Sequence, residues 1–325
     1  MALLQKRKNF LIVLAVIALT ITILLIFLPS TSSRQTSFNS RDILSPASSR
    51  EDSFAFAVIG DTQRFNAGRN NGGLQKAVKN ISKTDSAFVI ALGDIASSCR
   101  GNSKCGKKWK KWKKIIEADV PQVYPVMGNH DRANREADAL WQNIFNLPAN
   151  GPSGYGELVY SFNYANSHFV VLNSEVTHTQ LINSAQREWL EQDLRENPNK
   201  NIFVFFHQPA WPASEKIGES LDVHPAERDA LWRIFAKYNV KAVFSGHEHM
   251  YSRRKITSSQ LAGGENEVYQ FIVGNTDTFK HKAPSRGTTD FYNRNRSYVI
   301  VQVSGQAISV KNYSVSGKLV DEFQY

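Results

Sequence analysis

Five apolar segments of this 325-residue chain each stop abruptly at a residue that can bind a metal ion. In chain order, the segments end at Asp61, Asp94, Asn129–His130, His207 and His247–His249. Short runs of Val, Ile, Phe and Ala are typical of buried strands. Because ligands bind outside the carboxyl ends of parallel strands in open α/β sheets, we expect these five positions to meet at one edge of one sheet.

The beginning of the chain predicts a membrane anchor. Basic residues within 1–9 precede an uncharged apolar stretch at 10–28, and about 20 such residues span a bilayer core. Cleavable signal peptides have shorter apolar regions and a small-x-small site, and 29–33 offers small residues without a clear Ala-x-Ala. We therefore expect an uncleaved transmembrane signal anchor at 10–28, with residues 1–9 in the cytoplasm.

Residues 29–52 are rich in Ser and Thr and show no apolar periodicity, which predicts a flexible tether. The remaining residues, 53–325, are then expected as one domain outside the cytoplasm, with secretion after signal cleavage as the alternative. An exported compartment permits a disulfide between Cys99 and Cys105. Two free thiols are the alternative there.

Strand-like and helix-like segments alternate through the first two thirds of this domain. Strands are expected at 54–60, 87–92, 122–126, 159–164, 168–173, 202–206 and 242–244, and helices at 73–81, 107–118, 135–145, 184–195 and 226–238. The last third shows only strands, at 268–273, 298–303, 308–313 and 319–323, which we expect to form antiparallel pairs. This pattern predicts an α/β fold, a four-layer αββα sandwich of two mixed sheets flanked by helices.

The candidate ligands offer oxygen and nitrogen but no sulfur. They are the carboxylates of Asp61 and Asp94, the amide oxygens of Gln63 and Asn129, and the imidazoles of His207, His247 and His249. Such a set suits Mn, Fe, Zn or Co. Seven ligands are too many for one tetrahedral ion, and they suit two ions about 3.5–4 Å apart that share a carboxylate.

The order of these motifs resembles the five sequence blocks of the calcineurin-like metallophosphoesterase superfamily over residues 54 to about 275. The blocks are Gly60-Asp61-x-Gln63, Gly93-Asp94, Gly128-Asn129-His130-Asp131, His207 and Gly246-His247-x-His249. The resemblance implies that Asp61, Gln63, Asp94 and His249 hold one ion. It also implies that Asp94, Asn129, His207 and His247 hold the other, so that Asp94 bridges the pair.

The same resemblance gives His130 and Asp131 catalytic roles. His130 would stabilise the transition state and protonate the leaving oxygen, and Asp131 would orient its imidazole. The activity implied is hydrolysis of phosphate monoesters or diesters by attack of a hydroxide held between two divalent or trivalent metal ions. A phosphorylated small molecule or a phosphoprotein is the expected substrate, and no nucleic-acid partner is expected. A non-catalytic phosphate- or envelope-binding protein on the same fold is the alternative.

Two positions depart from the family pattern. Most members have His where this chain has Gln63, and an amide oxygen shifts that site towards Mn or Mg. We therefore expect Mn, with Fe, Zn or Mg as alternatives. The alternative that Gln63 is a bystander and not a metal ligand stays open. In purple acid phosphatases a Tyr that ligates iron stands where this chain has Ser97, although Gly246–Arg253 resembles that group's last motif.

A lysine-rich segment at 107–114 invites a second interpretation. Trp109 and Trp112 recur at helical spacing within it, which favours an ordinary surface helix with its tryptophans in the core. Contact of the lysines with an anionic membrane surface is the alternative. Arg64, Arg132 and Arg253 adjoin the motifs and are candidates for phosphate binding.

Overall fold

A computed structural model describes residues 53–65, 72–97, 103–132, 135–175, 180–198, 200–257 and 266–325. The predicted basic region, anchor and tether lie outside these residues, as does Cys99. No helix within the described ranges is long and apolar enough to cross a membrane. The anchor and the disulfide therefore stay predictions.

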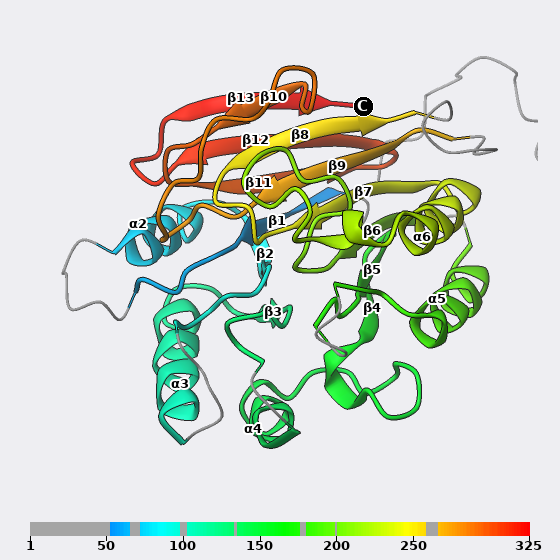
Figure 1. Cartoon of the computed structure of the whole chain (residues 1–325). Helices are drawn as coiled ribbons and strands as arrows, with labels where there is room; N and C mark the ends of the chain where they lie inside the picture. The colour runs from blue at the N-terminus through cyan, green and yellow to red at the C-terminus, as the bar shows by residue number, and fades with distance from the viewer. Residues whose placement is uncertain are drawn as a thin grey trace, which may run out of the picture. The chain divides into compact units, whose positions relative to one another are not determined.

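The first of two β-sheets combines the start and the end of the domain (Figure 1). Its strand order is β13-β12-β11-β1-β2-β3, with β1 Ser53–Ile59, β2 Ser86–Ala91, β3 Val123–Pro125, β11 Ser297–Ser304, β12 Ala307–Ser314 and β13 Leu319–Gln324. Strands β1, β2 and β3 are parallel, and β11 joins β1 antiparallel. The predicted antiparallel pairing of the last three strands is confirmed.

The second sheet contains the strands that lead to the histidine motifs. Its order is β10-β8-β9-β7-β6-β5-β4, with β4 Tyr160–Tyr164, β5 Ser167–Val171, β6 Asn201–Phe205, β7 Val240–Ser245, β8 Tyr251–Ile256, β9 Val268–Val273 and β10 Phe291–Asn293. Strands β5, β6, β7 and β9 are parallel, and the others are antiparallel to their neighbours. Both sheets are therefore mixed, as predicted.

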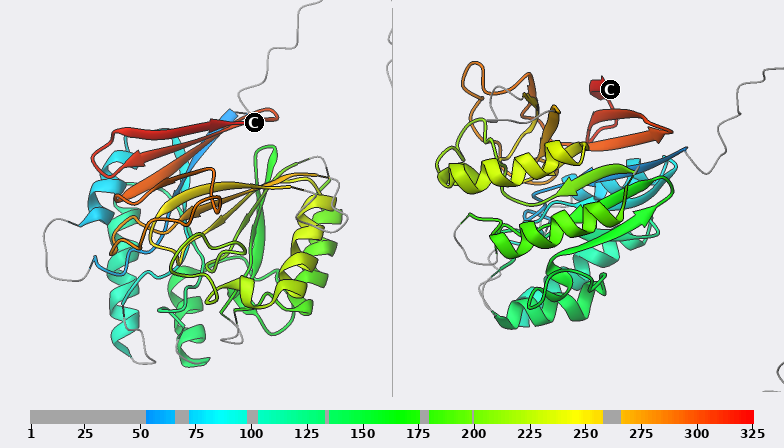
Figure 2. Two further views of the ribbon diagram at one scale, coloured as in Figure 1. Left: turned by 45° about the horizontal axis from the view of Figure 1, so that its top comes forward. Right: turned by 90° about the vertical axis from the view of Figure 1, so that its right-hand side faces the viewer.

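Helices fall into two groups that flank the sheets (Figure 2). One group is α2 Gly73–Ile81, α3 Ser103–Glu117 and α4 Arg135–Phe145, and the other is α5 Ser184–Glu196 and α6 Pro225–Lys237. Two single 3-10 turns, η2 Gly156–Leu158 and η3 Leu221–Val223, lie in the connections. The α/β class with two mixed sheets and flanking helices is confirmed.

Aromatic side chains fill the space between the two sheets. The ring of Phe56 on β1 lies 5.2 Å, between centroids, from both Phe169 on β5 and Phe203 on β6. On the other face of the second sheet, Leu190 of α5 and Trp232 of α6 are fully buried in a separate cluster. Two buried layers of this kind hold the strand ends, and hence the motifs, at fixed positions.

Helix α3 settles the interpretation of the lysine-rich segment. Trp109 and Trp112 are completely buried, as predicted for a surface helix with its tryptophans in the core. Their indole N–H groups donate to Asp131 Oδ1 and Thr62 Oγ1, at 3.2 and 2.9 Å. This helix therefore supports two of the motif loops directly.

Several local predictions were wrong. Strands β8 and β10 were not predicted, because the cations of β8 hid its pattern: Arg253 is neutralised by Asp321, with 2.9 Å between Nε and Oδ2. Strand β9 runs parallel to β7, because β8 reverses the chain before it. Helix α5 is capped by Asn183, whose side chain accepts from Gln186 N. Helix α3 begins at Ser103 rather than at the predicted residue 107, so Cys105 lies buried within it.

Candidate metal centre

The predicted ligands follow the carboxyl ends of strands from both sheets. Asp61, Asp94 and Asn129 come after β1, β2 and β3 of the first sheet, whereas His207 and His247 come after β6 and β7 of the second. Convergence is thus as predicted, but the site lies where two sheets meet rather than at one edge of one sheet. Packing the sheets face to face brings both sets of strand ends together.

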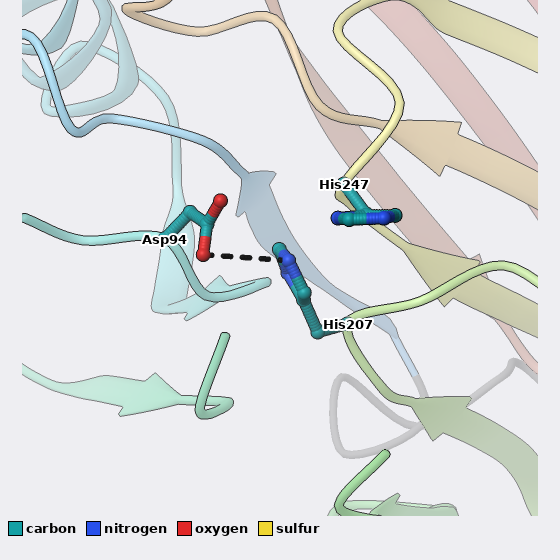
Figure 3. A group of neighbouring side chains, drawn as sticks. All are labelled: Asp94, His207 and His247. Atoms are coloured by element: carbon teal, nitrogen blue, oxygen red, sulfur yellow. Dashed lines mark ion pairs between the residues drawn. The ribbon is translucent and has the colours of Figure 1, made fainter. Parts of the chain in front are cut away.

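Two ligand groups share one carboxylate. Ligand atoms of Asp94, His207 and His247 all lie within 4.8 Å of one another, and so do those of Asp61, Asp94 and His249. Figure 3 shows the first group, with Asp94 Oδ1 3.4 Å from His207 Nε2. Asn129 Oδ1 adds a further oxygen 2.9 Å from the same nitrogen. The geometry matches two adjacent ions bridged by Asp94.

The second group carries unsatisfied acceptors. Asp61 Oδ1 and Gln63 Oε1 are buried without a hydrogen-bond partner among the described residues, a situation that costs about 1–3 kcal/mol per group unless a ligand relieves it. His249 Nε2 lies 3.4 Å from Asp61 Oδ1 and 3.4 Å from Gln63 Nε2. These oxygens fit a cation, and they place Gln63 among its candidate ligands.

Each imidazole is oriented through its other nitrogen. His207 Nδ1 donates to Leu92 O at 2.7 Å, which leaves Nε2 for a metal. His247 Nε2 lies 3.3 Å from Glu219 O and leaves Nδ1. His249 Nδ1 lies 3.4 Å from Thr278 Oγ1 and leaves Nε2. Outer partners of this kind fix the tautomer of metal-binding histidines, so the donor set fits a two-metal centre.

Burial and charge act against each other in the site. Burial lowers the pKa of His207, but the charges of Asp94, Asp61 and Glu175 outweigh it and raise this pKa to about 9. Burial raises the pKa of Asp61 and lowers that of His247 well below its ordinary value. The carboxylates therefore attract positive charge here, and bound cations would replace the proton of His207.

The backbone at the ligands is strained. Asp61, Asp94 and His247 have φ values of 52°, 49° and 65°, in the left-handed region that non-glycine residues rarely adopt. Such strain costs about 1–3 kcal/mol per residue and clusters at functional sites. Close approach at Gly246 explains one motif glycine, since a Cβ there would lie 2.6 Å from Asp61 Oδ2.

His130 and Asp131 lie next to each other in sequence but face different surroundings. The His130 side chain is 49% exposed, and its Nε2 lies 3.8 Å from Asp94 Oδ2. Its backbone N–H donates to Asp94 Oδ1 at 2.9 Å. This placement beside the shared carboxylate suits a group that meets a substrate.

The carboxylate of Asp131 connects two of the motif loops. Its completely buried carboxylate turns away from solvent and accepts from the backbone N–H groups of Gly128, Ile95 and Ala96 and from the Trp109 indole, at 3.1–3.3 Å. Burial and the Asp94 charge raise its pKa to about 7, and the N–H donors oppose that rise. Asp131 therefore ties the Asp94 loop to the Asn129 loop, and its role in orienting His130 stays a prediction.

Four residues around the ligands were not predicted. Glu175 accepts from Gln208 Nε2 at 2.7 Å, next to His207, and Glu248 accepts from Ala213 N and Ser214 N at 2.6 Å each. Thr278 and His281 both contact His249, His281 by ring stacking at 4.0 Å. The position of Glu248 between two motif histidines was the one available signal, because the others lie in loops without periodicity.

The three candidate arginines differ in how they are engaged. Arg253 is committed to Asp321. Arg132 lies 3.4 Å from Asp138 and also donates to the carbonyl of Glu175. Arg64 has no ion-pair partner in the described part of the chain, and its guanidinium lies 3.9 Å above the ring of Phe279. Arg64 is thus the arginine still available to a ligand.

Comparison with known proteins agrees with this geometry. Residues 54–251 match the family model described as calcineurin-like phosphoesterase, and the chain belongs to this family. It is 27% identical over 239 residues to a phosphoenolpyruvate phosphatase of Allium cepa, covering 69% of this chain and 45% of that protein. It is 26% identical over 231 residues to an Fe(3+)–Zn(2+) purple acid phosphatase of Arabidopsis thaliana, covering 66% and 46%.

The chain spans about half the length of these curated relatives. A purple acid phosphatase from yellow lupin (Lupinus luteus) seeds superposes with a TM-score of 0.69 at 19% identity, covering 84% of this chain and 53% of that one. This structural likeness shows a shared fold. The matched family region contains every predicted metal ligand, from Asp61 to His249.

Proposed function

We propose that this protein is a metal-dependent phosphoesterase. The observation that carries the proposal is the Asp94 carboxylate, which belongs to both ligand groups in a chain of the calcineurin-like phosphoesterase family. Asp61, Gln63 and His249 would hold one cation with Asp94. Asn129, His207 and His247 would hold the other.

When bound, two such cations supply the Lewis acidity that polarises a phosphoryl oxygen and lowers the pKa of a water molecule. The protein's own residues set the geometry. Asp94 and His207 are buried, whereas the imidazole of His130 is half-exposed beside Asp94 and is therefore open to a substrate. We propose that its Nε2 donates a hydrogen bond to the phosphate and then a proton to the leaving oxygen.

The proposed metals are Mn, with Fe, Zn or Mg as alternatives. An amide oxygen from Gln63 favours harder ions, whereas the name of the Arabidopsis relative specifies iron and zinc. Reconstitution of the full-length protein with each metal, followed by turnover of a panel of phosphate monoesters and diesters, tests both metal and substrate class. Metal binding without turnover of any ester would instead favour a non-catalytic phosphate-binding protein.

We propose a phosphorylated small molecule or a phosphoprotein as substrate. The first of these is supported by the name of the Allium relative, a phosphoenolpyruvate phosphatase.

We also propose that residues 10–28 anchor the enzyme in a membrane with its domain outside the cytoplasm. The support is the uncharged apolar sequence of that stretch and the basic residues before it. Fractionation of the native protein tests this. Recovery in the membrane pellet after a carbonate wash is expected, and a soluble product lacking the first 30 or so residues would contradict it.

A further inference from the structure

Residues 274–290 form the loop between β9 and β10, and this loop contacts His249 of the last metal motif. Its Thr278 and His281 contact the His249 ring, and His249 N donates to His281 Nδ1 at 3.0 Å. Residues that lie between Thr278 and His281 are therefore held at the rim of the metal centre.

Phe279 lies between these two contacts and is 66% exposed, more than any other large hydrophobic residue in the described part of the chain. An aromatic ring held open to water loses the benefit of burial, about 25 cal/mol per Å² of apolar surface. Core packing therefore does not explain its position. Its ring instead stacks under the Arg64 guanidinium at 3.9 Å.

Arg64 links this ring to the other side of the same metal site. It directly follows the candidate ligand Gln63, and its backbone N–H donates to Asp277 O at 3.2 Å. Neighbouring Lys280 does not compete for a substrate, because its Nζ bonds Asn295 Oδ1 at 2.6 Å. The ring and the cation therefore form a fixed pair beside Gln63 and His249.

A second loop completes the rim at the other metal. Residues 210–224 reach His247 through Glu219 O and expose Ile217 by 52%. Ser214 Oγ donates to Lys282 O at 3.0 Å, which joins this loop to the 274–290 loop. Exposed apolar side chains thus stand on both of the connected loops that contact the metal histidines, Phe279 on one and Ile217 and Val223 on the other.

We infer that Phe279 and Arg64 form a stacking platform for an aromatic group carried by the phosphorylated substrate. This inference rests on the proposed function and narrows its substrate class to phosphate esters with an aromatic ring close to the phosphate. Aromatic faces bind planar rings by offset stacking, and the guanidinium holds the Phe279 ring in place through its π-face. Phe279 and Arg64 are then specificity-determining residues, not catalytic ones.

Phosphonates test the inference by binding alone, because their carbon–phosphorus bond is not hydrolysed. Calorimetry on the full-length, metal-loaded protein should show phenylphosphonate binding about tenfold tighter than methylphosphonate, the size that ring stacking contributes. Phe279→Ala should abolish this preference by weakening only phenylphosphonate, and Phe279→Leu should retain part of it. Tyr164→Ala, which removes an exposed aromatic at the other end of the parallel strands, should leave it unchanged.

Equal affinity of the wild-type protein for both phosphonates would overturn the inference and leave the proposed function standing. Binding of neither phosphonate would overturn both. Arg64→Gln should weaken phenylphosphonate selectively. Equal weakening of both ligands by this variant would assign Arg64 to the phosphate and overturn its part in the platform.

Discussion

The buried carboxylate of Asp131 gives the sharpest single test of the structure. It accepts from Gly128 N and Ile95 N at 3.1 Å, from Ala96 N at 3.3 Å and from Trp109 Nε1 at 3.2 Å. All four partners are donors, so the carboxylate connects the loops that carry Asp94 and Asn129. Replacing Asp131 should therefore lower the stability of the fold rather than act directly on catalysis.

The magnitude follows from the number of donors left without a partner. Each buried donor that loses its acceptor costs about 1–3 kcal/mol, so Asp131→Ala should lower the free energy of unfolding by roughly 4 kcal/mol or more. Such a loss is a large part of the about 5–15 kcal/mol that stabilises a typical domain. Asp131→Asn keeps one oxygen and turns an amide N–H₂ towards Gly128 N or Ile95 N, so we expect about 2–3 kcal/mol.

Equilibrium unfolding in denaturant measures both variants in the full-length protein, alongside turnover of an aryl phosphate at a temperature where each variant is folded. The predicted order of stability is wild type, then Asp131→Asn, then Asp131→Ala. If Asp131→Asn unfolded at the wild-type midpoint and lost only kcat, the hydrogen-bond reasoning would be refuted. That result would support the predicted role of Asp131 in orienting the His130 imidazole.

Four further variants test separate parts of the structure. Thr62→Val removes the acceptor of the buried Trp112 indole and should lower the free energy of unfolding by about 1–3 kcal/mol, and an unchanged denaturation midpoint would contradict this. Phe56→Ala removes the ring that packs between the sheets and should cost about 3–5 kcal/mol in the same assay, whereas a loss below 1 kcal/mol, roughly, would mean the sheets repack. Gly246→Ala places a Cβ 2.6 Å from Asp61 Oδ2 and should lower the bound metal measured by mass spectrometry, and full loading would refute the close approach. Glu248→Gln removes one of the two carboxylate oxygens that accept from the amides of Ala213 and Ser214. Hydrogen exchange of these amides should become about tenfold faster, and unaltered exchange would show that other contacts hold the loop.

The candidate ligands could be picked out from the sequence because their signal is local. Five of the seven candidates, Asp61, Asp94, Asn129, His207 and His247, follow the carboxyl ends of strands β1, β2, β3, β6 and β7, where open α/β sheets bind ligands. The chemistry of the donors suited two ions that share a carboxylate, and the family resemblance implied that Asp94 is this carboxylate. That these strand ends belong to two packed sheets, rather than to one edge of one sheet, could not be predicted in this way.

Side-chain direction could not be predicted in the same way. Asp131 follows His130 in the chain, but its carboxylate accepts from the buried Trp109 indole and from three backbone N–H groups. The assignment of Asp61 and His207 to different sheets also depends on long-range pairing, such as that of β1 with β11. Strand order of this kind leaves no periodic signal in a single sequence.

The surroundings of the site were the least predictable part. Strand β8 contains cations that mask its strand pattern in the sequence, and the structure shows that Arg253 forms an ion pair with Asp321 on β13. These two residues lie nearly seventy positions apart in the chain. In the sequence His281 is an isolated histidine, and only the folded 274–290 loop brings its ring against the ring of His249. In both examples the role of the residue depends on a contact between segments that lie far apart in the chain.

The shared role of Asp94 is tested most directly by counting metal ions. Elemental mass spectrometry of the full-length protein, with aryl phosphate turnover on the same sample, compares wild type with Asp94→Asn. The exposed Asp119, which lies after α3, supplies the control variant Asp119→Asn. We predict two ions per chain and turnover for wild type and control, and loss of both ions and of turnover for Asp94→Asn. Full turnover by Asp94→Asn with both ions retained would contradict the bridged two-metal centre.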